Sequence, residues 1–415
     1  MIRRIVAALV AASLAVACAT ARSSSPSVGK GYQRVTQDWT GSSTSGHFVD
    51  PSLSSQSANL WNHYQGIAVL YAEWKTNQPQ ASDALSRIKA EAAWVKATWP
   101  NASTWSSCGT GAMLPALDDV AWTAHAFLVF NEVTGDKFWL TAAKNAIDCS
   151  GNRWYDPNWG GLWYNDAKVS KRSYTAELVF DMLRYDELAH VSDYLGDAQY
   201  TYQWATTNVA PCGSGVIAGV SSNCLYRSDG GFWDGVGANG NAVLPTTQTS
   251  PTPPPADATG TPYQIQLAAT LPSWGWSVTF LEGNMMWSVV AAKLNAISPN
   301  PAFAAQINAT AAFMAAHESY QGGFLDDQDA NTDAAAAYFY RTFAEPLLTS
   351  ANKTKIDAMY AATASGVVAG NWSWDWQLPA SCGVWCNQGF GSSADPKAPL
   401  APIANSTMWA VMGGL

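Results

Sequence analysis

The stretch ALDDVAWTAHAFLVFNEVTGDKFWLTAAKNAID, residues 116–148, contains the clearest helical pattern of this chain. Its apolar residues recur at spacings of three and four, which predicts one helix over Asp119–Val133 and a second over Asp136–Asp148. Only Thr134-Gly135 separates the two segments, and Asp136 is a favoured residue for a helix N-cap. So short a connection predicts two helices packed side by side as a hairpin.

The same helical pattern repeats along the chain, whereas strand patterns are few and short. It predicts eleven helices, over Ala58–Trp74, Asp83–Trp99, Asp119–Val133, Asp136–Asp148, Lys171–Val191, Asp193–Thr206, Ser277–Ile297, Pro301–Ser319, Asp329–Leu348, Asn352–Ala364 and Ala404–Gly413. No linker divides them into two complete sets. We therefore predict one all-α domain, a toroid of paired helices.

Composition limits the class of protein. The chain has 415 residues, of which 48% are hydrophobic and 13% charged, enough to bury a large core. With a net charge of −9 it has no basic stripe to neutralise phosphates, so we expect no nucleic-acid partner. The 21 Trp residues are unusual, and aromatic rings pack against the C–H faces of sugars as well as in protein cores.

The N-terminus predicts export. A basic start and a short apolar run end at Cys18, which indicates a signal peptide over residues 1–21. Ala15–Cys18 partly matches a lipoprotein signal, so either Cys18 carries a lipid tether or the signal is cut at an Ala-x-Ala site. Residues 22–46 predict a flexible tether, which leaves 47–415 for the domain. We expect a secreted, periplasmic or cell-surface protein.

Six cysteines remain when Cys18 is set aside. An even number in an exported chain predicts three disulfides. Proximity in the sequence favours Cys212–Cys224 and Cys382–Cys386, which leaves Cys108–Cys149. A structural zinc site is the weaker alternative, because none of the five His residues has ligand spacing to a cysteine.

Two polar stretches interrupt the helical pattern. Residues 235–262, rich in Pro and Thr, predict a surface loop inserted into the helical array. Phe324–Asp329 contains three Asp residues, which either bind calcium or cap the helix that starts near Asp329, and we favour capping. His125 lies among apolar and small residues, which predicts a core histidine rather than a catalyst.

Asp118 and Asp119 stand side by side where the first quoted helix begins, with Trp122 one turn further on. Cleavage of a glycosidic bond uses two carboxyl groups, one ionised and one protonated. A helix dipole favours an anion in the first turn, and repulsion raises the pKa of the carboxyl that ionises second. An Asp pair is also an ordinary helix cap. The pair alone is therefore a candidate site and nothing more.

An aromatic block follows the pair along the chain. Trp159–Asp166 presents Trp163, Tyr164 and Asn165 on a glycine-containing turn, and a polar segment begins at Lys171. Aromatic rings with hydrogen-bonding groups between them are typical of the floor of a binding groove. A loop packed by its own aromatic residues is an equal alternative.

In this order the motifs resemble glycoside hydrolase family 76, the endo-α-1,6-mannanases. The resemblance is good from about Leu60 to Leu195. Its motifs are Asp118-Asp119 with Trp122, Thr134-Gly135-Asp136, Gly161–Tyr164 and Lys171–Ser173. Weaker matches are Phe232–Gly235 and Thr279–Asn284. Glu282 replaces an expected Gln and Arg172-Ser173 replaces Asn-Ala, departures that bear on specificity more than on reaction type.

The resemblance implies an (α/α)6 barrel, which agrees with the helical pattern. It also implies a retaining glycoside hydrolase that cuts α-1,6-mannosidic bonds inside mannan, with Asp118 as nucleophile and Asp119 as general acid/base. The implied substrate-binding residues are Trp122, Trp163, Tyr164, Asn165, Asp234 and Glu282. Core packing is an equal alternative for Trp122, and helix capping or a loop hydrogen bond for the two acids.

We expect the substrate to be α-mannan or another mannose-containing polysaccharide. Two carboxylates and water suffice for the reaction, so we expect no cofactor and no metal, and we expect a monomer. Three alternatives keep the fold: a transglycosylase of cell-wall mannan, a hydrolase of another α-linked polysaccharide, and a catalytically silent carbohydrate-binding protein. The intact Asp118-Asp119 pair argues against the last, because a pure binding protein gains nothing from two repelling acids.

Overall fold

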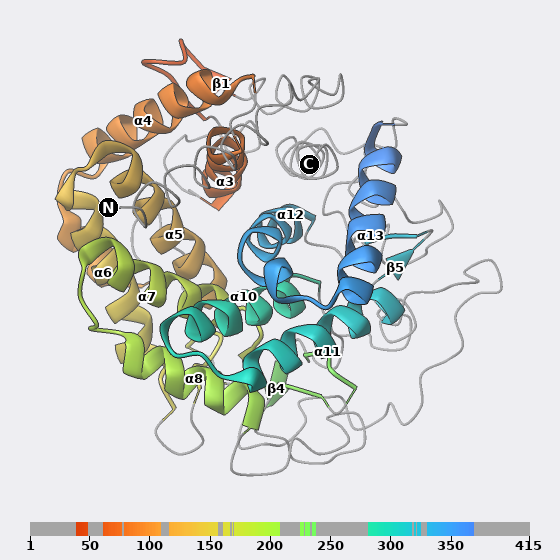
Figure 1. Cartoon of the computed structure of the whole chain (residues 1–415). Helices are drawn as coiled ribbons and strands as arrows, with labels where there is room; N and C mark the ends of the chain where they lie inside the picture. The colour runs from red at the N-terminus through yellow and green to blue at the C-terminus, as the bar shows by residue number, and fades with distance from the viewer. Residues whose placement is uncertain are drawn as a thin grey trace, which may run out of the picture.

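Inner and outer helices alternate around a common centre (Figure 1). The computed structural model describes residues 39–48, 61–76, 79–108, 116–156, 161–166, 168, 170–207, 225–227, 229–232, 235–237, 281–317, 319–320, 322–324 and 330–368. The predicted signal peptide with Cys18, the disulfides Cys212–Cys224 and Cys382–Cys386, Asp234 and Asp326–Asp329 lie outside the described residues.

Ten α-helices occur in the described part of the chain, and each lies on a segment that was predicted to be helical. In chain order they are α3 (Trp61–Lys75), α4 (Ala81–Thr98), α5 (Leu117–Thr134), α6 (Lys137–Trp154), α7 (Thr175–Ala189), α8 (Leu195–Thr207), α10 (Leu281–Ile297), α11 (Pro301–His317), α12 (Ala330–Phe339) and α13 (Ser350–Val368). The eleventh predicted helix, Ala404–Gly413, lies outside the described residues. Within those residues, none of the helices combines the length and hydropathy needed to cross a membrane.

The helices form two concentric layers. The inner ring consists of α3, α5, α7, α10 and α12, and the outer ring of α4, α6, α8, α11 and α13 (Figure 1). Neighbouring inner helices contact one another, and α12 packs back onto α3. Helices α5 and α10 are buried along most of their length because their sequences are apolar on every face, whereas α4 buries a stripe that includes Ala84, Ile88 and Val95. The predicted all-α helical toroid is confirmed.

The hairpin of α5 and α6 forms as the quoted stretch predicts. Gly135 adopts a left-handed conformation with φ 69°, and its N–H donates to the carbonyl of Asn131 at 2.7 Å, which ends α5. Asp136 then accepts a hydrogen bond from the Phe138 N–H at 3.0 Å and caps α6. One glycine and one aspartate therefore reverse the chain between an inner and an outer helix.

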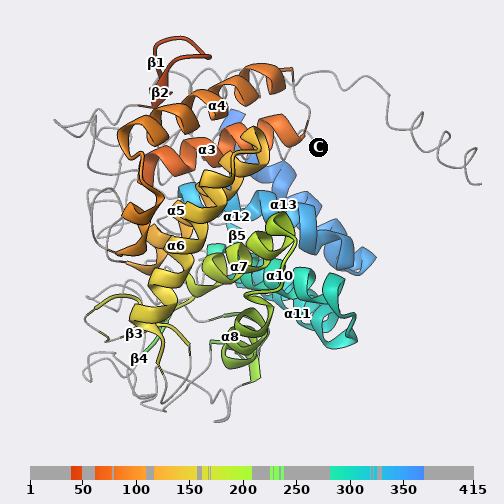
Figure 2. The same ribbon diagram turned by 90° about the vertical axis from the view of Figure 1, so that its left-hand side faces the viewer.

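Three antiparallel two-stranded sheets occur among the described residues. They pair β1 (Trp39–Thr40) with β2 (His47–Phe48), β3 (Ser170–Arg172) with β4 (Gly235–Gly237), and β5 (Ser319–Tyr320) with β6 (Gly323–Phe324). The sheet of β3 and β4 lies at the opposite end of the molecule from β1 and β2 in Figure 2. It brings the start of the predicted insertion at residue 235 against the segment that precedes α7.

The predicted helix start at Lys171 is wrong. Lys171 pairs with Val236 and Arg172 with Gly235, so these residues are extended, and α7 begins at Thr175 after a turn. The helical spacing of the apolar residues does extend back to this point, but the backbone N–H and C=O groups are used by the strand pairing instead. The strand therefore holds two basic residues beside the first turn of α7.

The predicted helix Asp329–Leu348 is also interrupted. The α-helix ends at Phe339 and continues as a π-helix, η5 (Tyr340–Ala344), followed by a 3-10 helix, η6 (Glu345–Leu347). Pro346 lies in η6 and has no N–H to continue the α-helical hydrogen bonds. The irregular turns allow the chain to reach the next outer helix.

The predicted disulfide Cys108–Cys149 is present, with 5.9 Å between the two Cα atoms. It joins the segment after the 3-10 helix η2 (Ala102–Ser106) to α6. Aromatic rings pack beside it: the ring centroids of Trp105 and Phe127 lie 4.8 Å apart, and those of Phe127 and Trp139 lie 5.4 Å apart. The disulfide and this cluster attach the segment that leads toward Asp118 to the hairpin of α5 and α6.

Candidate active site

Three consecutive inner helices each place acidic residues in their first turn. These are Asp118 and Asp119 on α5, Glu177 on α7 and Glu282 on α10. The N-terminal ends of the three helices lie close together. As a result the charge of Asp118 raises the pKa of Glu177, and the Glu282 side chain interacts with Glu177. Helix dipoles favour negative charge at such ends. The toroid therefore gathers these four carboxyl groups at the N-terminal ends of its inner helices, and we call this cluster the acidic mouth.

Asp118 lies in a partly polar environment. Burial raises the pKa of Asp118. The backbone N–H of Asp119, the Arg172 guanidinium and the Tyr164 hydroxyl oppose part of this rise by stabilising the carboxylate. The Tyr164 hydroxyl donates to Oδ2 at 3.4 Å. The buried Oδ1 atom accepts no hydrogen bond from the residues that the structure describes. One oxygen is thus restrained by Tyr164, and the other is buried inside the site.

The loop that carries Tyr164 is attached to the start of α5. The N–H of Leu117 donates to the carbonyl of Tyr164 at 2.9 Å, and Ala116 forms a β-bridge with Asn165. The N–H of Trp163 donates to the carbonyl of Trp154 at 2.8 Å, at the end of α6. These backbone contacts explain how two motifs more than 40 residues apart, at Asp118 and Tyr164, meet in one site.

Gly161 permits the turn that begins this loop. Its φ is 72°, and an added Cβ would lie 2.5 Å from the Trp204 ring. A side chain is therefore excluded by both conformation and space. At the other end of the loop, Arg153 binds Asp166, with Nε 2.6 Å from Oδ1, and also donates to the carbonyl of Cys108.

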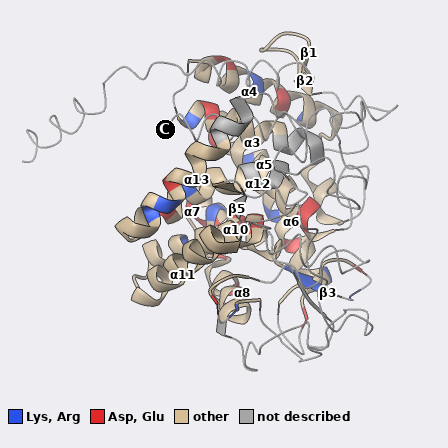
Figure 3. Ribbon diagram, turned by 90° about the vertical axis from the view of Figure 1, so that its right-hand side faces the viewer, with Lys and Arg blue, Asp and Glu red and all other residues tan. Residues whose placement is uncertain are grey.

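Arg172 is a site residue that the sequence indicated only as a departure from the family pattern. It belongs to β3, the blue strand in Figure 3, and its guanidinium lies 5.4 Å from the Tyr164 ring centroid and 5.7 Å from that of Tyr174. This position lets its charge act on Asp118. Spacing along the chain carried no signal for it, because the β3–β4 pairing sets its place.

Trp163 packs against a buried ion pair. Lys171 Nζ lies 2.7 Å from Asp156 Oδ2 and 4.7 Å from the centroid of the Trp163 ring. Only 7% of Trp163 is exposed, and only 2% of Trp122, whose ring lies edge-on to His125 in the core. Tyr164 and Asn165 are half-buried and therefore more accessible than the two Trp rings. Stacking of Trp122 and Trp163 on sugar stays a prediction.

Glu177 is a site residue that the sequence reasoning missed. It is 3% exposed, and burial raises its pKa well above the usual range for Glu. The signal was present, because Glu177 lies in a helical first turn as Asp118 and Glu282 do. The wrong helix start at Lys171 concealed it.

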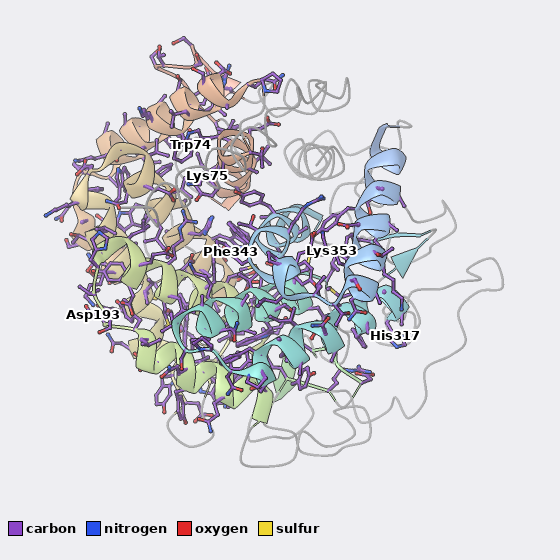
Figure 4. All side chains as sticks on the ribbon, viewed as in Figure 1. Trp74, Lys75, Asp193, His317, Phe343 and Lys353 are labelled. Carbon is purple, nitrogen blue, oxygen red and sulfur yellow. A yellow bond between two sulfur atoms is a disulfide. The ribbon has the colours of Figure 1, made fainter. Side chains whose placement is uncertain are left out.

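A buried polar column continues below the acidic mouth. His125 Nδ1 lies 3.1 Å from Asp181 Oδ1, one turn below Glu177 on α7, and burial keeps the pKa of His125 well below its usual value. The predicted core location of this histidine is confirmed. Further down, Arg184 donates to the Tyr71 hydroxyl at 2.9 Å and binds Glu132, which also binds Lys75 of α3, labelled in Figure 4.

Among the described residues, no group of three or more His, Cys, Asp and Glu side chains is arranged to hold a metal ion. The acidic mouth instead combines several carboxyls with one guanidinium and one phenol. Carboxyl groups with different surroundings can share the tasks of an acid and a base.

No protein-family model and no curated protein matches this sequence. Several solved structures match almost the whole chain. One is the α-1,6-mannanase GH76A of Salegentibacter sp. HEL1_6, in an inactive variant with two consecutive aspartates replaced by asparagine, bound to α-1,6-mannotriose. It has 11% sequence identity and a TM-score of 0.59, and the match covers 93% of this chain and 98% of that chain.

The chain has the fold of family 76 glycoside hydrolases. A family 76 mannosidase from Bacteroides thetaiotaomicron VPI-5482 matches with 12% identity and a TM-score of 0.58, covering 94% of this chain and 97% of that one. The Lin0763 protein from Listeria innocua matches with 14% identity and a TM-score of 0.59, covering 92% and 95%. The resemblance in the motifs is thus confirmed at the level of the family 76 fold.

Proposed function

We propose that this protein is a retaining glycoside hydrolase that cuts α-1,6-mannosidic bonds inside mannan chains. The observation that carries the proposal is the Asp118-Asp119 pair in the first turn of an inner helix, beside Arg172 and Tyr164. A consecutive aspartate pair is also what the inactive mannotriose-bound structure of the same fold lacks. The fold, the pair and the aromatic loop together support this chemistry.

The surroundings of the pair support separate roles. Arg172 and Tyr164 both favour the ionised form of Asp118, which suits a nucleophile. Asp119 follows it directly, and the charge of Asp118 favours retention of a proton on its neighbour, which suits a general acid. The same repulsion falls when Asp118 forms a bond to sugar, so Asp119 can then act as a base.

The reaction follows in two steps. Asp118 attacks the anomeric carbon while Asp119 gives its proton to the leaving glycosidic oxygen, which breaks the C–O bond and leaves a glycosyl ester on Asp118. Asp119 then takes a proton from water, the water oxygen bonds to the anomeric carbon, and the ester bond to Asp118 breaks. Two inversions restore the starting configuration.

The half-buried Tyr164 and Asn165 lie in the loop that contacts Asp118, so we propose that they bind the sugar beside the scissile bond. Glu282 is 1% exposed, so we propose that it adjusts the charge of the pair, and binding of a sugar hydroxyl by Glu282 stays a prediction. We also propose export, from the signal sequence before Cys18.

A time course with linear α-1,6-mannan tests the function. We expect short manno-oligosaccharides of mixed length early in the reaction, with the α configuration in the first products by NMR. Asp118→Asn and Asp119→Asn should each lower turnover by about three orders of magnitude or more with little change in melting temperature. Asp83→Asn, a first-turn acid of the outer helix α4, is the matched control and should retain activity.

Other products would indicate a different function. Longer chains in the presence of an oligosaccharide acceptor, with little cleavage, would indicate a transglycosylase. Saturable binding with neither product would contradict an enzymatic role.

A further inference from the structure

Glu177 and Glu282 form a buried pair of acids from two neighbouring inner helices. Glu177 is 3% exposed and Glu282 is 1% exposed, each in the first turn of its helix. The Glu282 side chain interacts with Glu177. Apart from this contact with Glu282, the buried Oε atoms of Glu177 have no hydrogen-bonding partner among the side chains that the structure describes.

The contact between the two helices is close at this point. An added Cβ on Gly283 would lie 2.3 Å from Oγ of Ser173 and 2.8 Å from its Cβ. The first turn of α10 is therefore pressed against the segment that leads into α7. This close packing brings the first turn of α10, which carries Glu282, beside the segment that leads into the first turn of α7.

The carboxyl groups of the acidic mouth are too close together and too well buried for all of them to be ionised at once. The ionisable groups around Glu177 are Asp118 of α5, Asp181 of its own helix and Glu282 of α10, and Arg172 of β3 acts on Asp118. Two adjacent buried carboxylates repel each other strongly, and a proton between them converts the repulsion into a hydrogen bond. Burial and the charge of Asp118 both raise the pKa of Glu177.

We propose that Glu177 and Glu282 share a single proton, and that this carboxyl–carboxylate pair is a positioning element that preserves the negative charge of Asp118. The residue that supplies the second carboxyl of the pair is Glu282, in the first turn of α10. With Gln at this position, its amide N–H donates to an ionised Glu177, and no proton is needed. With Glu, the pair carries a proton that it can lose.

Loss of the shared proton changes the electrostatics around Asp118. A second negative charge beside Asp118 raises the pKa of Asp118 and opposes the development of further charge in the mouth. We therefore expect the pair to contribute to the loss of activity at alkaline pH. This second consequence rests on the proposed function, whereas the shared proton itself does not.

Infrared spectroscopy of the full chain tests the shared proton without substrate. At pH 7 the wild-type protein should show a protonated-carboxyl C=O band that is lost in Glu177→Gln and equally in Glu282→Gln. Both variants should lose it, because the remaining acid ionises once its partner is an amide. Other buried acids such as Glu73 keep their own bands, so the measurement is the wild-type-minus-variant difference spectrum. A difference spectrum with no lost carboxyl band for either substitution would overturn the proposal.

A kinetic measurement tests the positioning role. The alkaline limb of the kcat/KM profile on α-1,6-mannan should move to higher pH in Glu282→Gln, because no shared proton remains to be lost. Glu73→Gln is the matched control, since Glu73 is another buried acid, on α3 and outside this mouth. It should remove its own infrared band and leave the alkaline limb in place.

The outcomes separate the two proposals. Absence of mannan cleavage by a protein that shows the shared band would contradict the proposed function and leave the pair intact. An alkaline limb that does not move in an active Glu282→Gln protein would overturn the positioning role. If Glu177→Gln does not fold, loss of the carboxyl infrared band in Glu282→Gln still tests the shared proton.

Discussion

At the residue scale, Asp118 shows how opposing effects set the state of one carboxyl. Burial raises its pKa, and the Arg172 guanidinium lowers it. The proposed nucleophile must be ionised, so it loses function as pH falls through this pKa. The backbone N–H of Asp119 also lowers this pKa, and among side chains the largest lowering effect comes from Arg172, which the β3–β4 pairing holds beside the Tyr164 ring.

Removal of Arg172 should therefore shift the acid limb of activity. In Arg172→Met the pKa of Asp118 rises, so the acid limb of kcat/KM moves to higher pH and kcat/KM near the optimum falls by about tenfold or more. The pH profile on α-1,6-mannan measures both effects. Arg227→Met removes an arginine that pairs with Asp229, and it should leave the acid limb unchanged. An unmoved limb in the Arg172 variant would show that another acid is the nucleophile.

Glu73 provides a residue-scale test of stability. It precedes Trp74 and Lys75, labelled in Figure 4, and burial raises its pKa to about 8 from an ordinary value of 4.5. The folded state then holds more protons than the unfolded state between these pH values. Stability should fall by about 1.4 kcal/mol for each pH unit across that window through this group.

Thermal unfolding of Glu73→Gln measures this contribution. The variant should unfold at a higher temperature than wild type at pH 8, with the difference shrinking toward pH 4.5. An equal pH dependence in the two proteins would mean that Glu73 ionises in the folded state without penalty.

At the element scale, helical periodicity predicted all ten described helices, because apolar spacing reports which face of a helix is buried. It failed where backbone pairing or proline overrode the pattern, at Lys171–Arg172 in β3 and at Pro346 in η6. The Asp118-Asp119 pair was found because it lies at a clear helix start. Glu177 was missed because the start of α7 was placed four residues early.

Gly283 tests the contact between α7 and α10. Helix propensity alone favours Ala over Gly by about 1 kcal/mol. The added Cβ would lie 2.3 Å from Ser173 Oγ, and the clash should dominate, lowering the free energy of unfolding by about 1–3 kcal/mol. Chemical denaturation of Gly283→Ala measures the sum.

Gly151 of α6 is the matched control for this substitution. Nothing lies within 4 Å of an added Cβ there, so Gly151→Ala should stabilise the protein by about 0.5–1 kcal/mol. Destabilisation of equal size in both variants would mean that the Ser173 contact is not the cause.

At the scale of the whole molecule, the toroid brings distant segments to one mouth. Three helices that begin at Leu117, Thr175 and Leu281 contribute acids to the same place. No local pattern could predict that meeting, since it depends on the parallel arrangement of the inner helices. The order of the motifs and the resemblance to family 76 supplied the expectation, and the fold confirms the architecture on which it depends.

The disulfide Cys108–Cys149 should stabilise this arrangement. It closes a loop with a sequence separation of 41 residues, for which loss of chain entropy in the unfolded state predicts about 3–4 kcal/mol. The Cys108→Ser, Cys149→Ser double variant should show a lower melting temperature and reduced activity, because the segment before Asp118 loses an attachment to α6. Unchanged unfolding in the double variant would show that the bond closes a loop already held by the fold.

We propose Asp118 as the nucleophile of a retaining mechanism. Treatment with a 2-deoxy-2-fluoro-mannosyl fluoride, followed by proteolysis and mass spectrometry, tests it most directly, because such a reagent slows release of the glycosyl-enzyme. We predict one covalent sugar adduct, located on Asp118 and absent from Asp118→Asn. An adduct on Asp119, Glu177 or Glu282, or cleavage of mannan with inversion and no adduct, would contradict the account.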